Sequence, residues 1–171
     1  MNTSLRTTAT VTCTCGQVTV NAVGAPIACV VCYCDDCQEG ARQLQSLPNA
    51  VAVQDPDGGT GYLVYRKDRV NCLQGGALLR NHKIRVDSAT NRVVASCCNS
   101  AMFVNFDDAR HWVDLYRSRC HGDVAPVQMR VGTKFKPQGL ILPTDVPHYP
   151  RFAPSFLLKL LLARVAMLFE R

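Results

Sequence analysis

Three of the ten cysteines in this chain lie within the short segment Cys32-Tyr33-Cys34-Asp35-Asp36-Cys37. Thiolates separated by one and two residues suit a zinc ion, which takes soft sulfur ligands in a tetrahedron. Cys32, Cys34 and Cys37 supply three ligands, so the fourth position is left for water or for the sulfur of a substrate. Because such a zinc acts as a Lewis acid and stabilises a bound thiolate, this segment predicts a catalytic metal site.

A closed structural site is the alternative for the same three cysteines. Cys29, Cys72 or Cys120 would then supply the fourth sulfur. Cys29 lies close by in the chain, on the strand that is expected just before the motif, whereas the positions of Cys72 and Cys120 depend on the fold.

A second group of cysteines is predicted to form a closed, structural zinc site. Cys13 and Cys15 lie in a Cys-Thr-Cys-Gly turn, and the adjacent pair Cys97 and Cys98 follows much later in the chain. A structural zinc bound by four thiolates contributes directly to folding. Adjacent sulfurs seldom both reach one ion, so Cys97, Cys98 or both remain candidates. Buried, inert cysteines are the other interpretation.

Composition and charge favour a globular protein of the reducing cytoplasm. The 171 residues are 47% hydrophobic, and the segment Met1–Thr12 has no apolar stretch of the kind found in signal peptides. In a reducing compartment, clustered cysteines more often bind metal than form disulfides. We therefore expect a cytoplasmic location. We expect no transmembrane segment either, because Lys159 and Arg164 interrupt the apolar C-terminal run.

The positive charge of the chain is modest and scattered. The formal net charge is +6, and it falls to +3 if a Zn(Cys)₄ site carries −2 and a Zn(Cys)₃ site carries −1. No run of five like charges occurs, so we predict no nucleic-acid partner. A mildly positive surface suits a small anionic ligand.

Short alternating segments between turn signals predict a mainly β domain. A hairpin is expected over 11–22, and further strands over 27–33, 62–66, 82–86, 92–96, 102–106 and 112–116. Only a turn is expected around 38–42. The predicted organisation is a zinc-binding β domain over 1–142, a proline-rich linker over 143–154 and an amphipathic helix over 155–171, which could mediate homodimer formation.

Three blocks of this chain resemble a known family. They are Cys13-Thr14-Cys15-Gly16, the segment Cys32–Cys37, and Cys98 followed by Asn99-Ser100-Ala101-Met102-Phe103. These blocks are similar to the signatures of the glutathione-dependent formaldehyde-activating enzyme (GFA) family, also named for centromere protein V (CENP-V), over roughly residues 8–135.

The resemblance implies an Mss4-like β-tent of short antiparallel strands with zinc knuckles. It also implies one structural and one catalytic zinc, and carbon–sulfur lyase chemistry that interconverts glutathione plus formaldehyde with S-hydroxymethylglutathione. By position, Cys13, Cys15 and Cys98 map onto the structural zinc, and the Cys32–Cys37 segment maps onto the catalytic one.

Two positions depart from the family pattern. The first cysteine of the family's C-x-x-C-G block falls at Ala95, so Cys97 is the candidate replacement. The histidine of the family's C-H-C motif is Tyr33 in this chain. These departures indicate a branch of the superfamily that binds another thiol, or none.

The sequence therefore predicts a zinc-dependent carbon–sulfur lyase-like enzyme that acts on a thiol adduct such as S-hydroxymethylglutathione. Arg66 and Arg69 are candidates to bind the carboxylates of a glutathione-like ligand. The alternatives are a non-enzymatic zinc-binding structural or interaction module, and a thiol or metal sensor that releases zinc on oxidation. The enzyme requires a pocket beside the open metal position, whereas the interaction module predicts an exposed apolar helix face.

Overall fold

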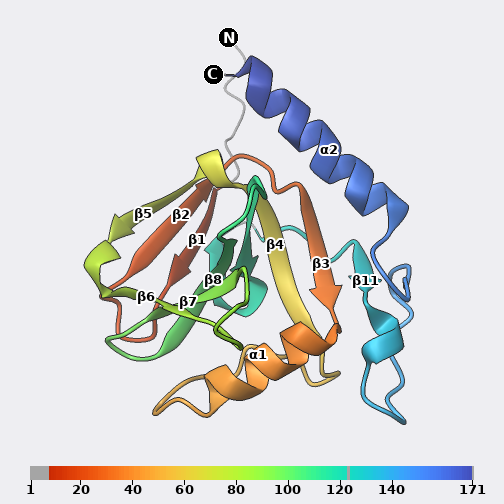
Figure 1. Cartoon of the computed structure of the whole chain (residues 1–171), viewed down its shortest axis with the longest axis horizontal. Coiled ribbons are helices and arrows are strands. Elements are labelled where there is room, and N and C mark those ends of the chain that lie inside the picture. Colours follow the sequence, from red (N-terminus) through yellow and green to blue (C-terminus); the bar gives the residue numbers. More distant parts are fainter. Residues whose placement is uncertain (1–7, 123, 171) are drawn as a thin grey trace.

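The architecture is that of a computed structural model, which describes residues 8–122 and 124–170. Within these residues eleven strands form two sheets, and the predicted mainly β class is confirmed (Figure 1). The smaller sheet has the order β10 (Cys120–Gly122), β1 (Thr8–Thr12), β2 (Thr19–Val23) and β5 (Val70–Gln74). The larger sheet has the order β11 (Met129–Val131), β3 (Ala28–Cys32), β4 (Thr60–Arg66), β9 (Trp112–Tyr116), β8 (Ser100–Phe106), β7 (Thr90–Ala95) and β6 (Leu79–His82).

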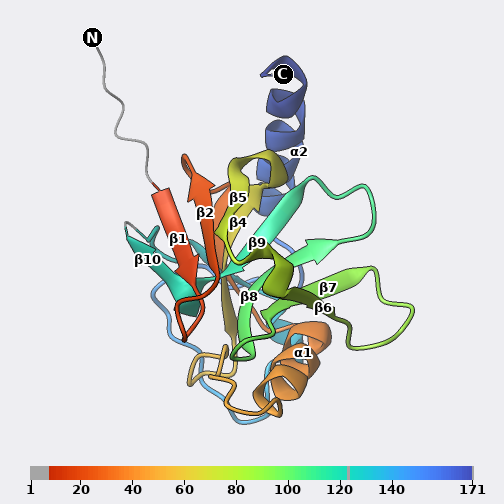
Figure 2. The ribbon, with the colours of Figure 1, turned by 90° about the vertical axis from the view of Figure 1, so that its left-hand side faces the viewer.

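The larger sheet is apolar on both faces, because successive side chains of a strand point to opposite sides. On one face Leu63 and Leu115 belong to a buried cluster with Val11 and Val20 of the smaller sheet. On the other face Tyr62 and its neighbours pack against two helices, α1 (Asp35–Gln45) and α2 (Pro154–Phe169). Figure 2 shows the smaller sheet and the helices on different sides of the larger sheet. The fold therefore separates a face between the sheets from a face under the helices.

Most of the predicted strands are present, and the prediction of one strand, over 82–86, is wrong. The hairpin over 11–22 corresponds to the antiparallel pair β1 and β2. A strand was expected over 82–86, but β6 ends at His82, which pairs with Arg92 as its last partner. The chain then turns, because Lys83 donates to the carbonyl of Ser88 at 2.8 Å and binds Asp107 at 2.6 Å.

Helix α1 was not expected as a helix. Its pattern is weak because only three of its residues, Gly40, Ala41 and Leu44, are buried. Asp35 and Asp36 lie in its first turn, where negative charge favours the helix N-terminus. The structure therefore replaces the turn expected around 38–42 with a helix that begins inside the cysteine motif.

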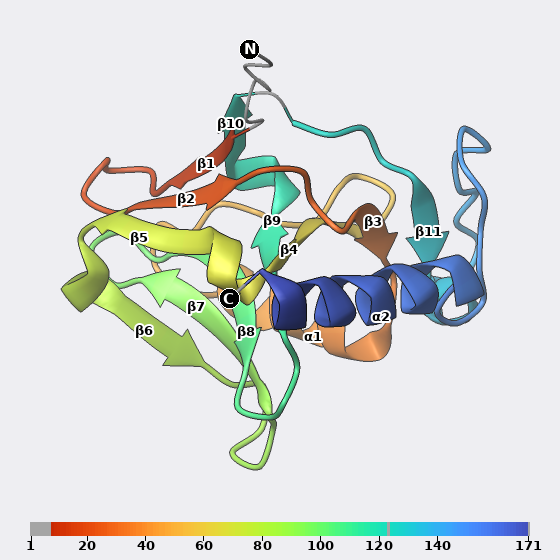
Figure 3. The ribbon, with the colours of Figure 1, turned by 90° about the horizontal axis from the view of Figure 1, so that it is seen from above.

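Helix α2 packs on the body of the protein through a narrow stripe. Phe156 and Leu160 are buried against the larger sheet, while many apolar side chains of the same helix remain exposed. Figure 3 shows α2 lying across the molecule on the same side as α1. No helix in the described part of the chain is long and apolar enough to span a bilayer. Residues 1–7, which open the predicted β domain, and Arg171, at the end of the predicted helix, lie outside the described residues.

Candidate metal centres

Four cysteines from distant parts of the chain meet between the two sheets. Cys13 and Cys15 come from the turn that joins β1 to β2, and Cys97 and Cys98 come from the turn that joins β7 to β8. Their Sγ atoms all lie within 4.8 Å of one another. The group therefore connects the smaller sheet to the larger one.

The spacing of these sulfurs matches what a tetrahedral ion requires. Bonds of about 2.3 Å to a central zinc would place the sulfurs about 3.8 Å apart. The Sγ atom of Cys13 lies 3.6 Å from that of Cys15 and 3.8 Å from that of Cys97, and Cys15 and Cys97 are 3.3 Å apart. Cys97 and Cys98 are 3.8 Å apart, so the structure places both adjacent sulfurs in the group.

Polar neighbours stabilise negative charge in this group. The backbone N–H of Val18 donates to the Sγ atom of Cys13 at 3.2 Å, and the Ser100 hydroxyl lies 3.1 Å from the Sγ atom of Cys98. Although desolvation raises the pKa of Cys98, hydrogen bonds from Ser100 and Thr14 outweigh it and lower that pKa to about 5. Hydrogen bonds of this kind favour thiolates, which are the form that binds metal.

The second group forms where β3 ends and α1 begins. Cys32 is the last residue of β3, Cys34 is the N-cap of α1, and Cys37 lies in its first turn, where its N–H donates to the carbonyl of Cys34 at 3.0 Å. The three Sγ atoms lie within 4.8 Å of one another. The strand end and the helix start thus present three sulfurs over the face under the helices.

None of the cysteines considered as a fourth ligand belongs to this second group among the described residues. Cys29 lies three positions before Cys32 on β3, and it is buried in the cluster between the sheets. Cys72 lies on β5 and Cys120 on β10, which are both strands of the smaller sheet. The side chain of Cys29 therefore points to the face of the larger sheet opposite to the three-cysteine group. The group offers three sulfurs to a metal ion.

The three sulfurs compete for protons. Hydrogen bonds from Cys32 and Cys37 lower the pKa of Cys34 to about 3, and the nearby charge of Arg92 acts in the same direction. The hydrogen bond to Cys34 and the burial of Cys32 raise the pKa of Cys32 to about 12, and the pKa of Cys37 is raised as well. A dication would allow all three sulfurs to be thiolates, so the donor set fits a soft metal ion.

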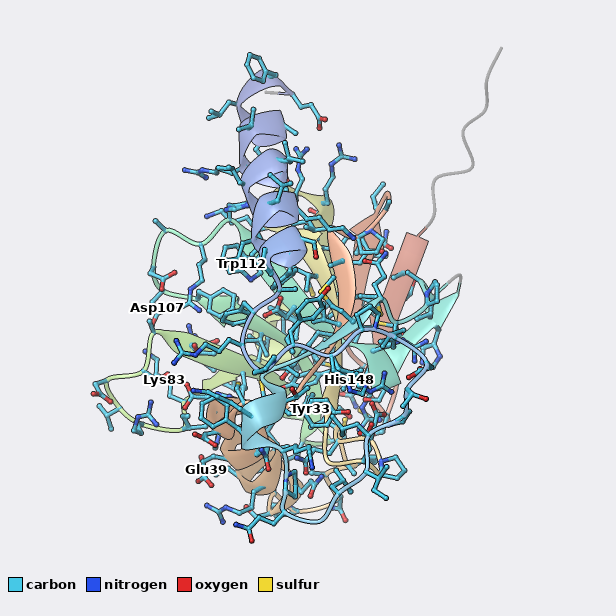
Figure 4. All side chains as sticks on the ribbon, turned by 90° about the vertical axis from the view of Figure 1, so that its right-hand side faces the viewer. Tyr33, Glu39, Lys83, Asp107, Trp112 and His148 are labelled. Atoms are coloured by element: carbon cyan, nitrogen blue, oxygen red, sulfur yellow. The ribbon has the colours of Figure 1, made fainter. Side chains whose placement is uncertain are left out.

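Tyr33, the residue between Cys32 and Cys34, faces away from these sulfurs. Its side chain is fully buried with Val31 and Leu142, and its hydroxyl donates to Asp57 at 2.6 Å. Figure 4 shows Tyr33 well apart from Trp112, which lies by α2. A side chain between Cys32 and Cys34 on an extended segment must point to the opposite side. Tyr33 therefore lies on the side of the strand opposite to the cysteine ligands.

A cavity of about 380 Å³ adjoins the three-cysteine group. All three cysteines line it, and α2 forms another wall through Phe156 and Leu160. Tyr62 lines it as well, with its hydroxyl 3.6 Å from the Sγ atom of Cys37. The structure thus places an accessible space beside the group that has three sulfurs.

Besides Asp36 of the cysteine motif, three charged residues line this cavity, and these three were not identified from the sequence. Arg92 is buried on β7 and donates to the backbone carbonyl of Asp36, while Arg110 binds Asp108 at 2.6 Å. Burial raises the pKa of Asp114 to about 7, against the opposing charge of Arg110. These residues lie on or beside strands and follow no motif, so no local sequence signal marks them.

Other residues considered as ligands or binding groups lie elsewhere. Arg66 and Arg69 bind Glu170 near the end of α2, at 2.8 and 2.6 Å, and neither lines the cavity. The prediction that they meet the carboxylates of a ligand beside the cysteines therefore has no geometric support. Within the described residues, neither cysteine group includes a histidine.

Comparison with known proteins leaves the family of this chain open. No protein-family model matches the chain, and no curated protein matches it. The crystal structure of a Rhodobacter sphaeroides protein, a Northeast Structural Genomics target, is similar with a TM-score of 0.46 and 12% sequence identity, over 81% of this chain and 98% of that one. Metal binding is therefore inferred from the cysteine geometry of the chain itself.

Proposed function

We propose that this protein binds two zinc ions and acts as a carbon–sulfur lyase-like enzyme on a thiol adduct. Cys13, Cys15, Cys97 and Cys98 would hold a structural ion, while the three-cysteine group would hold the second. The observation that carries the proposal is the cavity beside the three-cysteine group, because a site with three protein ligands and access for a small molecule is typical of catalytic zinc.

The reaction is the reversible cleavage of a hemithioacetal, the S-hydroxymethyl adduct of a thiol and formaldehyde. The carbon–sulfur bond breaks, the hydroxyl gives up its proton as the aldehyde forms, and the departing sulfur takes a proton to become the thiol. When bound, the metal supplies a Lewis acid that stabilises the sulfur as a thiolate. Asp114 is a cavity residue with a pKa of about 7, so its carboxyl can take or return a proton near neutral pH.

We also propose the Mss4-like β-tent as the specific fold. Two sheets of short, mostly antiparallel strands and a four-cysteine group at the turns that join β1 to β2 and β7 to β8 support it. The turn at Cys13 has the backbone hydrogen bonds of a tight knuckle, since Gly16 donates to the carbonyl of Cys13 at 3.0 Å with a positive φ of 78°.

Zinc content tests the proposal directly. We expect two zinc ions per chain in the parent protein and one in Cys34→Ser, with the far-ultraviolet circular dichroism unchanged. The lyase step is then followed by nuclear magnetic resonance, as exchange between the S-hydroxymethyl adduct and the free thiol plus formaldehyde. Catalysis by the parent and none by Cys34→Ser would support the enzyme. A parent with one zinc or none would refute the two-site proposal.

A second function, self-association through α2, is favoured by a different observation. Seven apolar side chains of α2 are between 41% and 83% exposed; they are Leu157, Leu158, Leu161, Leu162, Val165, Leu168 and Phe169. Isolated exposed leucines are common, but a continuous patch of several hundred Å² usually marks an interaction site. We propose a second copy of this chain as the occupant, since a helix about 24 Å long paired across a two-fold axis presents the same patch twice.

Sedimentation velocity distinguishes this interface from other uses of the same face. We expect the parent to sediment as a dimer and Leu161→Glu as a monomer, whereas Ser155→Glu, at an exposed position outside the apolar patch, stays dimeric. A parent that is monomeric at all accessible concentrations would refute self-association. Co-sedimentation of that monomer with anionic vesicles would instead assign the face to a lipid surface.

A further inference from the structure

The cavity beside the three-cysteine group has mostly apolar walls. Aromatic and aliphatic side chains from both sheet and helix enclose it, among them Val64, Val104, Phe106, Trp112, Phe156 and Leu160. Phe106 and Trp112 meet edge to face, with ring centroids 5.7 Å apart. Walls of this kind bind a ligand by removing apolar surface from water, and a few polar groups orient it.

The cations of the cavity are already engaged. Arg110 binds Asp108 through two nitrogens, at 2.8 and 2.6 Å, and its guanidinium stacks on Phe106 with 3.8 Å to the ring centroid. Arg92 donates to the carbonyl of Asp36 and packs closely over Gly40. The paired donors of Arg110 are therefore occupied, whereas Arg92 keeps one nitrogen, Nη1, without a partner.

One polar donor of a residue that lines the cavity has no partner among the described residues. The Nη1 atom of Arg92 is buried and has no hydrogen-bond partner within the described residues. A buried donor without an acceptor costs free energy, so a ligand that brings one acceptor atom would be favoured here. A peptide thiol such as glutathione brings two carboxylates and an ammonium group. Asp36 and Asp114 of the lining could pair with the ammonium group, but the two carboxylates would share one unpartnered donor.

From these walls and charges we infer that the substrate of the three-cysteine site is an apolar thiol adduct, with an aromatic or branched aliphatic body and a single polar group beside its sulfur. This inference rests on the proposed function for its sulfur–metal contact, but the apolar body follows from the cavity itself. The protein thus selects for a hydrophobic thiol and against glutathione.

Trp112 provides a reporter for binding, since it is the single tryptophan of the chain and lines the cavity. The zinc-loaded full chain is titrated with phenylmethanethiol, with glutathione, and with phenylmethanol, which has the same apolar body but no sulfur. We expect phenylmethanethiol to change the Trp112 fluorescence saturably and to bind about tenfold or more tightly than either of the others. Zinc content is measured after each titration to confirm that the thiol has not removed the ion.

Two neighbouring leucines give a matched pair of variants. Leu157 is 53% exposed and lines the cavity, whereas Leu158 is 55% exposed and does not. Because both positions are half exposed, either glutamate should be tolerated by the fold. Both leucines belong to the apolar patch of α2 proposed for self-association, so either glutamate would disturb a dimer alike, and a difference between the two variants reports on the cavity. We expect Leu157→Glu to weaken phenylmethanethiol binding about tenfold, and Leu158→Glu to leave it unchanged.

The outcomes separate this inference from the proposed function. Equal or tighter binding of glutathione would overturn the apolar substrate while leaving the metal site intact. Equal binding of phenylmethanol and phenylmethanethiol would overturn the sulfur contact, and with it the proposed function, while leaving the apolar cavity. A fluorescence that none of the three probes alters, or an equal loss in both leucine variants, would overturn the inference.

Discussion

The two cysteine groups should contribute very differently to global stability, because they close chain segments of very different length. A metal bound at the four-cysteine group links Cys13 to Cys97 across 84 residues, and it joins the smaller sheet to the larger one. A metal at the three-cysteine group links residues that are already neighbours at the junction of β3 and α1. We therefore compare Cys13→Ser with Cys34→Ser.

The size of the difference follows from the entropy of loop closure. Cross-linking a loop of 84 residues stabilises a protein by about 4.5 kcal/mol, whereas a loop of six residues contributes only about 2 kcal/mol. For a chain of this length, 1 kcal/mol corresponds to roughly 2–4 °C in melting temperature. We expect Cys13→Ser to lower the melting temperature by about 9–18 °C and Cys34→Ser by about 4–9 °C.

Thermal unfolding followed by circular dichroism, together with zinc content, measures both effects on the same samples. Each variant should lose one zinc per chain, so the comparison holds the number of lost ions constant. The reasoning is refuted if Cys34→Ser lowers the melting temperature as much as Cys13→Ser does. It is also refuted if Cys13→Ser loses its ion and still melts within about 3 °C of the parent, since about 9 °C is the smallest shift expected.

Three further predictions concern groups around the two sites. Gly40→Ala should lower the free energy of unfolding by about 1–3 kcal/mol in urea, because a Cβ atom there meets the buried guanidinium of Arg92, and an unchanged urea midpoint would contradict this contact. Burial raises the pKa of Asp114 to about 7, so its protonated form is the one favoured in the fold. The stability of the parent relative to Asp114→Asn should therefore fall as the pH rises from about 4 to about 7. A difference in urea midpoint between the two proteins that is the same at pH 5 and at pH 8 would exclude this effect. Tyr33→Phe should cost about 1–2 kcal/mol through its lost hydrogen bond to Asp57 and should keep both zinc ions, so a lower zinc content would show that Tyr33 supports the metal site after all.

Local spacing was sufficient to predict the features that depend on neighbours in the chain. The one- and two-residue gaps predicted that Cys32, Cys34 and Cys37 could share a metal ion, and their sulfurs lie in one group because residues two apart on an extended segment share a side. Short alternating segments around a turn predicted the hairpin that corresponds to β1 and β2. Helix α1 escaped prediction because Ala41 and Leu44 are too few to produce a helical apolar pattern.

The cysteine spacing determined on its own that this chain carries one group of three clustered sulfurs and a second pair that needs distant partners. The tertiary structure decided what surrounds them. Pairing of β3 with β4 assigned Cys29 to the face between the sheets and Cys32 to the face under the helices. Packing of α2 then formed the cavity that Arg92 and Asp114 line together with the cysteines. Those contacts join strands and helices that are distant in sequence, and their relative placement depends on sheet order and helix packing, which no short segment of sequence encodes.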